Sequence, residues 1–431
     1  MIAADGPRHA LDRALSAAES ASPVDAAESV TRELARTLHA TAVSFLIADL
    51  SGRALVRLAH VRSDEQAPAD GDRHRGDDRE SATVLPFDGG PQEEVVRSQR
   101  ALVLPPRTPA AGDPDAPGGR HGADDSDAWT VLAPVTERGE SLGLLEMLLP
   151  VEPDADTVAE VARAARLLAF VVIANRRHTD LYEWGQRTRP FTLSAEIQRR
   201  LLPAAFTCEA DAFTLSGWLE PAASVGGDTF DYSVARDALH LSMTDAMGHG
   251  VGSALTASLC VGSLRTVRRR GGSLLEQATA ANAALVEHVA SVQSEAFVTG
   301  VMGRLDLVSG DLTLVNAGHV APYLARAGEV APVALPPGLP LGLFADAVYS
   351  ATTLPLRPGD RLVFVTDGML ERNAANFVLS TGIRDTRALH ARDAVRHLSD
   401  RILDITGDEL ADDATIMVLD WRGGHVSDRS A

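Results

Sequence analysis

Hydrophobic positions in the first third of the chain alternate between helical and strand spacing. Apolar residues recur three or four apart between Val24 and Ala40, which predicts a helix. The apolar run 42–48 and the alternating run 53–60 predict a hairpin. Runs 129–136 and 141–149 repeat this pattern around a polar turn and predict a second hairpin. This order of elements predicts an α+β domain with an antiparallel sheet.

Two stretches, residues 62–81 and 105–127, are rich in Pro, Gly, Asp and Arg, and we expect both to be loops or linkers. A long helix is predicted from about Asp154 to Gln186. Its heptad-like apolar stripe favours dimerisation, with packing on its own domain as the alternative. The stripe consists of Val158, Val161, Ala165, Leu168 and Val172, continued by Asn175 as a possible register-setting residue and by Tyr182.

The second half changes character at about Thr192. Helices are predicted at 192–202, 251–270, 273–292 and 392–406, with Gly-rich and strand-like segments between them. Residues 414–421 predict a closing strand.

Composition excludes several classes of protein. The chain has 431 residues, is 45% apolar and carries a net charge of −19, so it is not a disordered chain and is not expected to bind nucleic acid or anionic membranes. Two cysteines, Cys208 and Cys260, do not form a zinc or disulfide pattern. No secretory signal is visible, and the apolar run 167–174 is too short for a membrane span, so we expect a cytoplasmic protein.

Four acidic motifs in the second half are the candidate chemistry. Each alone is most often a turn or a helix cap. Carboxylates that converge at one place repel one another unless cations lie between them, and Mg²⁺ and Mn²⁺ suit oxygen ligands. Two such ions can activate a water and neutralise a phosphoryl group. The motifs are 224–231 around Asp228, 241–250 around Asp245, 362–369 around Asp367, and 411–418 with Asp412 and Asp413.

The second half closely resembles the metal-dependent protein phosphatases, in their bacterial SpoIIE/RsbU-type branch. The resemblance covers about residues 195–420 and includes the blocks 196–203 (EIQRRLLP), 316–319 (NAGH) and 339–342 (LPLG) as well as the acidic motifs. It implies an α-β-β-α sandwich of two antiparallel sheets flanked by helices. It also implies hydrolysis of phosphoserine or phosphothreonine by a water between two Mn²⁺ or Mg²⁺ ions.

The same resemblance implies individual roles. Asp228 would hold one metal, and Asp245 would bridge both, with the Ala246 carbonyl beside it. Asp367 and Asp412 would complete the other metal, with Asp413 ranked below Asp412.

Three further residues accompany these ligands. His249 either protonates the leaving serine oxygen or contacts the phosphate, or else it only holds its Gly-rich loop together. Asp231 is a supporting residue, and His319 is expected to make a structural hydrogen bond from its ring to the backbone.

The first half resembles a GAF domain in its element order alone. We therefore expect a GAF-like sensory domain at 10–153, a helical linker at 154–203 that forms a homodimer and relays control, and a phosphatase domain at 204–422. In this branch of the family the substrate is typically a phosphorylated anti-sigma factor antagonist, a STAS domain. The alternatives are a catalytically silent scaffold that binds a STAS partner, or another two-metal enzyme acting on nucleotides.

Overall fold

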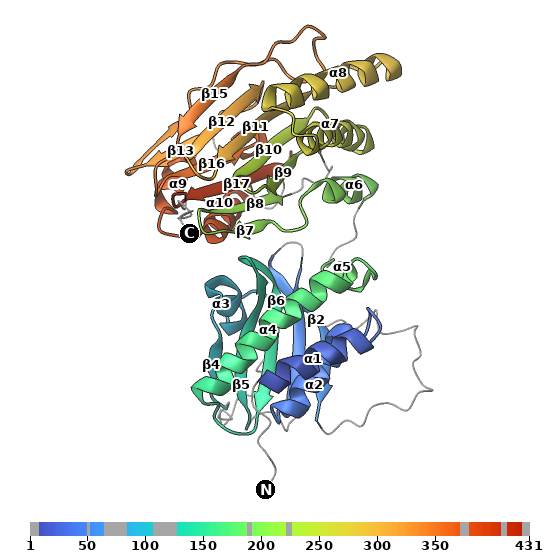
Figure 1. Cartoon of the computed structure of the whole chain (residues 1–431), viewed down its shortest axis with the longest axis vertical. Helices are drawn as coiled ribbons and strands as arrows, with labels where there is room; N and C mark the ends of the chain where they lie inside the picture. The colour runs from blue at the N-terminus through green and yellow to red at the C-terminus, as the bar shows by residue number, and fades with distance from the viewer. Residues whose placement is uncertain are drawn as a thin grey trace, which may run out of the picture. The chain divides into compact units, whose positions relative to one another are not determined.

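The computed structural model describes residues 8–49, 52–63, 84–106, 127–187, 192–220, 226–370, 379–406 and 412–424 (Figure 1). The chain forms two compact units, Met1–Pro190 and Phe191–Ala431. The predicted loops 62–81 and 105–127 lie almost entirely outside the described residues. None of the helices in the described ranges combines the length and apolar character that a membrane span requires.

The first unit is built on a six-stranded antiparallel sheet in the order β3-β2-β1-β6-β5-β4. Both predicted hairpins are confirmed, and pairing of β1 with β6 joins them into one sheet. The strands are β1 (Ala42–Ala48), β2 (Ala54–Arg62), β3 (Val84–Pro86), β4 (Leu102–Leu104), β5 (Trp129–Glu137) and β6 (Glu140–Leu149).

Successive side chains of β1 point to opposite faces of the sheet. Helices cover both of these faces. Val43, Phe45 and Ile47 face a core shared with α1 (Arg8–Ser20), α2 (Ala26–Thr37) and α4 (Ala155–Asn175). Leu46 and Ala48 face a smaller core shared with α3 (Pro91–Ser98). The sheet is therefore the middle layer of an α+β unit, as the sequence predicts.

The predicted long helix 154–186 is two helices. Asp154 caps α4 by accepting a hydrogen bond from the Thr157 amide at 2.8 Å. The helix ends at Asn175, whose side chain donates to the Val171 carbonyl at 2.9 Å, and α5 (Leu181–Gly185) follows. Asn175 therefore takes part in a local helix-end contact, where the sequence had suggested a register-setting position.

Most of the apolar stripe of α4 packs inside its own unit, which favours the alternative of packing on its own domain over a dimer seam, while Val158 is half-buried. Val161, Ala165 and Leu168 are fully buried, and Val172 is 2% exposed, all in the core that the sheet and α2 complete. These side chains have no surface left for a second copy. The predicted linker 154–203 also divides differently, since α4 and α5 belong to the first unit and α6 (Leu193–Leu201) to the second.

The second unit is a sandwich of two antiparallel sheets. The five-stranded sheet has the order β15-β12-β11-β10-β9, and the six-stranded sheet has the order β14-β13-β16-β17-β8-β7. Apolar side chains of both sheets, such as Phe213, Phe230 and Met417, fill the space between them. The strands are β7 (Thr207–Glu209), β8 (Phe213–Glu220), β9 (Thr229–Val234), β10 (Ala238–Ala246), β11 (Val298–Asp306), β12 (Asp311–Ala317), β13 (Tyr323–Arg326), β14 (Glu329–Pro332), β15 (Ala351–Pro355), β16 (Arg361–Val365) and β17 (Ala414–Trp421).

A pair of helices covers the outer face of each sheet. α7 (Val251–Arg269) and α8 (Leu274–Val292) pack on β10, β11 and β12 (Figure 1). α9 (Leu379–Asp385) and α10 (Ala391–Thr406) pack on β8, β13 and β17. The unit is thus the α-β-β-α sandwich expected from the resemblance.

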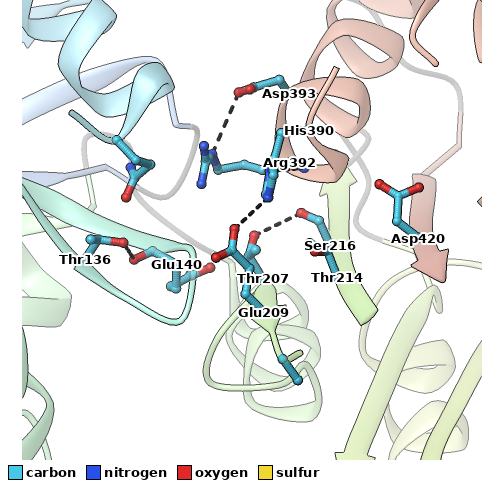
Figure 2. Close-up of polar contacts among 12 residues, drawn as sticks. Thr136, Glu140, Thr207, Glu209, Thr214, Ser216, His390, Arg392, Asp393 and Asp420 are labelled. Carbon is cyan, nitrogen blue, oxygen red and sulfur yellow. Dashed lines mark hydrogen bonds and ion pairs between the residues drawn. The ribbon is translucent and has the colours of Figure 1, made fainter. Parts of the chain in front are cut away.

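The edge strand β7 is held on both sides by polar contacts. The Thr207 and Ser216 hydroxyls lie 2.9 Å apart between β7 and β8, and His390 Nε2 lies 2.6 Å from Glu209 Oε1 (Figure 2). These contacts join β7 to its neighbour strand and to the residue that precedes α10.

Leu168→Ala tests whether α4 serves its own unit. We expect it to destabilise the first unit by about 2–5 kcal/mol, because it leaves a cavity in a packed core. Hydrogen–deuterium exchange on the full chain should show faster exchange in β1, β5 and β6 and unchanged exchange in the second unit. Arg166→Ala, at an exposed position of the same helix, is the control. A shift to a smaller species on size exclusion, without faster exchange, would contradict the packing described.

Candidate metal centre

The predicted acidic residues come from strand ends in both sheets. Asp228 precedes β9, and Asp245 lies one residue before the end of β10, both in the five-stranded sheet. Asp367 begins the short 3-10 helix η2 (Asp367–Met369) after β16, and Asp412 and Asp413 precede β17, in the six-stranded sheet. The sandwich therefore brings five carboxylates to one edge, where each influences the ionisation of its neighbours.

Asp228 is the most enclosed member of this set. Its side chain is 3% exposed, and its Oδ2 accepts hydrogen bonds from the Thr366 and Thr415 hydroxyls at 2.8 and 2.6 Å. Burial raises the pKa of Asp228 well above its usual value, and the charges of Asp245 and Asp413 raise it further. Because both threonines belong to the opposite sheet, these hydrogen bonds also join the two sheets at the site.

Asp245 is half-buried beside Asp228. Burial raises the pKa of Asp245 to about 7, helped by the charges of Asp367, Asp412 and Asp413, while a hydrogen bond with Asp228 opposes the rise. A hydrogen bond between two carboxyl groups requires one of them to carry a proton. Cations among these groups would take the place of that proton and remove the repulsion.

Asp413 and Asp412 differ sharply in their surroundings. Asp413 is 1% exposed, and its Oδ2 accepts from the Gln198 amide at 2.6 Å and from the Gly226 backbone N–H at 3.0 Å. Asp412 is exposed, and its Oδ1 accepts from the Asp413 backbone N–H at 2.8 Å. Asp413 is thus fixed by the fold, whereas Asp412 faces solvent, as a ligand that exchanges with water requires.

Glycines allow the backbone to approach these groups closely. A Cβ at Gly227 would lie 2.4 Å from the Ala246 carbonyl oxygen, and one at Gly226 would lie 3.0 Å from Asp413 Oδ2. The Ala246 carbonyl also lies 3.5 Å from the Ser253 hydroxyl, which donates to it. A carbonyl surrounded by small residues beside a row of carboxylates is a suitable ligand environment for a hard cation.

The donor set fits Mg²⁺ or Mn²⁺. All candidate ligands are oxygens, and the raised pKa values of Asp228 and Asp245 indicate that several negative charges are held together. Within the described residues, no three Asp, Glu, His or Cys side chains are already arranged around a single point. Mg²⁺ typically takes only one or two carboxylates and completes its shell with water and phosphate oxygens.

The remaining predicted residues, His249 and Asp231, have different surroundings. His249 is exposed on the loop between β10 and α7, between Gly248 and Gly250, which have φ of +90° and +80°. Asp231 is buried but faces α7, where it accepts from Arg265 at 2.8 and 3.1 Å and from Arg268 at 2.9 Å. Asp231 therefore anchors the helix that follows the Asp245 loop.

His319 is enclosed by structural contacts. Its Nδ1 lies 2.8 Å from the Thr299 hydroxyl, its ring also interacts with the Val365 backbone, and the Asn316 side chain bonds to both the N–H and the carbonyl of His319. Burial lowers the pKa of His319 to about 4, which the Val365 backbone partly opposes. A neutral, enclosed imidazole of this kind supports the sheet.

Three residues of the site were not assigned from the sequence. Thr366 and Thr415 lie within two residues of predicted acidic residues. Their position inside the acidic motifs could have indicated that they belong to the site. Gln198 lies in the block 196–203, which contributed to the resemblance without a role for any of its residues.

Comparison with known proteins agrees with this architecture. Residues 235–422 match the family model for stage II sporulation protein E (SpoIIE). Phosphoserine phosphatase RsbU of Bacillus subtilis is 22% identical over 233 residues, which are 53% of this chain and 68% of RsbU. Protein IcfG of Synechocystis is 22% identical over 201 residues, which are 41% of this chain and 32% of IcfG.

A crystal structure of the RsbU and RsbW domains of Rv1364c from Mycobacterium tuberculosis is also similar, with a TM-score of 0.43 and 25% identity, covering 55% of this chain and 65% of that one. Residues 235–422 of the second unit are therefore similar to the SpoIIE family, and part of the chain is similar to a phosphoserine phosphatase, RsbU. The matched part spans about two thirds of RsbU and a third of IcfG.

Gly227→Ala tests the carbonyl at the centre of the site. The added Cβ would collide with the Ala246 carbonyl, so we expect Mn²⁺ affinity to fall by about 10–100-fold, the usual effect of disturbing the shell around a metal ligand. Calorimetric titration with Mn²⁺ measures this. Gly252→Ala is the matched control, because a Cβ there has open space. Equal Mn²⁺ affinity in the two variants would contradict the role given to Ala246.

Proposed function

We propose that this protein hydrolyses phosphoserine or phosphothreonine on a protein substrate, using two divalent cations held by the acidic centre. The observation that carries the proposal is the gathering of Asp228, Asp245 and Asp413 at one edge of the sandwich, where burial and neighbouring charge raise the pKa of Asp228 and of Asp245. The match of residues 235–422 to the SpoIIE family model and the similarity to a phosphoserine phosphatase support it.

The chain's own residues have separate tasks in this proposal. Asp228 would hold one cation, and Asp367 and Asp412 would hold the other. Asp245 would serve both, with the Ala246 carbonyl beside it, and Asp413 would support them from its buried position. Two such ions lower the pKa of a water that they share and neutralise charge on the phosphoryl group.

The proposed proton donor to the leaving serine oxygen is His249. It stands four residues after Asp245, on a loop whose two positive-φ glycines hold the backbone away from helical geometry. An exposed imidazole on this loop can donate a proton to an oxygen that leaves toward solvent.

The proposed substrate is a phosphorylated STAS-domain antagonist of an anti-sigma factor, and the first unit controls the reaction as a sensor. The similarity to RsbU supports this substrate class. The route for control is α6, which begins at Leu193, two residues after the division between the units, and whose side chain at Gln198 reaches the acidic centre.

Asp367→Asn tests the phosphatase activity. With the purified full chain and a phosphorylated STAS protein, we expect phosphate release that requires Mn²⁺, that EDTA abolishes and that Asp367→Asn reduces by at least about 100-fold, because a ligand charge is lost. Asp237→Asn is the control, at an exposed turn before the opposite end of β10. Binding of the STAS protein without release of phosphate by the wild-type chain would favour the scaffold alternative.

His249→Gln distinguishes proton donation from a loop-holding role. We expect kcat on a phosphoserine substrate to fall by about 10²–10⁴-fold with KM and melting temperature unchanged, since the loss is confined to the transition state. Met247→Gln, an exposed change in the same loop, is the control. A lower melting temperature with nearly unchanged kcat would assign His249 to the loop alone.

A further inference from the structure

A pocket of about 440 Å³ lies at the far end of the six-stranded sheet from the acidic centre. It is formed by the turn that leads into β16, the turn between α9 and α10, and the end of β17. β17 runs from the acidic centre to Asp420, which lines the pocket (Figure 2). The eight residues of this strand span roughly 20–25 Å. The pocket is therefore separate from the site of the proposed reaction.

The two aspartates that line the pocket are each paired with an arginine. Asp420 accepts hydrogen bonds from Arg361 at 2.6 and 2.8 Å. Arg361 is 2% exposed and also donates to two backbone carbonyls of the turn between α9 and α10, so this pair is part of the fold. Asp360 accepts from Arg326 at 2.6, 3.0 and 3.2 Å. Both negative charges of the lining are thus already compensated.

Two further arginines of the lining contact neutral acceptors. Arg387 donates from Nη2 to the Gly359 carbonyl. Arg422 donates to the Thr214 hydroxyl at 2.6 Å and to three backbone carbonyls at the turn between β7 and β8. Within the described residues, neither guanidinium has a carboxylate partner. Both arginines are held in place by the fold while their positive charges remain uncompensated, which is the arrangement of an anion site.

The two arginines differ in the donors that they have left for a ligand. A guanidinium carries five N–H groups. The four hydrogen bonds of Arg422 use most of its donors, whereas Arg387 uses one of its own on the Gly359 carbonyl. Arg387 can therefore bind an oxyanion through two parallel hydrogen bonds, and Arg422 adds a fixed charge beside it.

Charge and size together indicate the class of ligand. A phosphate monoester carries roughly 1.5–2 negative charges at neutral pH, which matches two uncompensated arginines better than a single carboxylate does. The volume lies within the range of pockets that hold small organic molecules, roughly 300–1,000 Å³, and is more than a bare phosphate ion needs. Leu389, which is 39% exposed, and Trp421 add apolar surface for an organic group.

We propose that this pocket binds a small phosphate monoester, with Arg387 as the main ligand of the phosphoryl group and Arg422 as the second positive charge. The inference goes beyond the proposed function and does not depend on it, because the residues that line the pocket are distinct from the carboxylates of the acidic centre.

Calorimetric titration of the full chain in EDTA with phenyl phosphate and with inorganic phosphate tests the proposal. EDTA removes cations from the acidic centre, whose carboxylates then repel phosphate, so binding there does not interfere. We expect both probes to bind, and phenyl phosphate to bind more tightly because its ring contacts the apolar wall. Arg387→Gln should weaken both by about 10–100-fold, since charge-assisted hydrogen bonds are lost.

Arg384→Gln is the matched control, because Arg384 is an exposed arginine of α9 that also donates to a backbone carbonyl, that of Gly328, outside the pocket. Its affinity for phenyl phosphate should equal that of the wild-type chain. Phosphate release in Mn²⁺ should be the same for Arg387→Gln and the wild-type chain. If Arg387→Gln does not fold, Arg387→Lys, which keeps the charge and loses the paired donors, replaces it.

Four results would overturn the proposal. A wild-type chain that binds neither probe, or equal affinities in Arg387→Gln and the wild-type chain, would reject the site. An equal loss in Arg384→Gln would assign the effect to the overall positive charge of this surface. Inorganic phosphate that binds as tightly as phenyl phosphate would reject an ester as the ligand. Binding of a phosphoserine peptide without binding of phenyl phosphate would assign the pocket to a phosphoprotein.

Discussion

Mutual repulsion among buried carboxylates is the constraint on which the second unit depends. Beyond the effect of burial, the charges of Asp245 and Asp413 raise the pKa of Asp228, and the charge of Asp413 also raises that of Asp245. Asp228 and Asp413 are almost fully buried. Buried charges without compensation are strongly unfavourable. The fold compensates by aiming donors at them, namely the hydroxyls of Thr366 and Thr415, the amide of Gln198 and the N–H of Gly226.

The sandwich architecture makes this compensation possible. Donors for Asp228 come from the six-stranded sheet, although Asp228 itself leads into the five-stranded sheet. The site can therefore form only when the two sheets are packed over their shared core. The helices add a second layer of support, since α7 holds Asp231 through Arg265 and α6 supplies Gln198. Stability of the fold and geometry of the site depend on the same contacts.

Much of the fold and of the acidic site could be predicted from the sequence, because the patterns that indicate them are local. Apolar alternation predicted the hairpins 42–60 and 129–149, and the α7, α8 and α10 helices to within a few residues. Strand-end acidic residues identified the carboxylates that the fold gathers. The break between Asn175 and Leu181 was missed, since the stripe of α4 continues in register through Tyr182, which is buried on the separate helix α5.

Contacts between distant segments could not be read in this way. Gln198 and Asp413 are 215 positions apart, and nothing in the spacing of either motif indicates that they meet. The seam of α4 was ambiguous for the same reason, because apolar spacing shows that a face is buried but not which surface covers it. In the structure it is the sheet of its own unit.

Anomalous diffraction from crystals of the full chain grown with Mn²⁺ tests the central claim most directly. The account predicts two peaks, one beside Asp228 and the Ala246 carbonyl and one beside Asp367 and Asp412, with Asp245 between them. No peak among these residues at saturating Mn²⁺, or a peak held by other side chains, would contradict it.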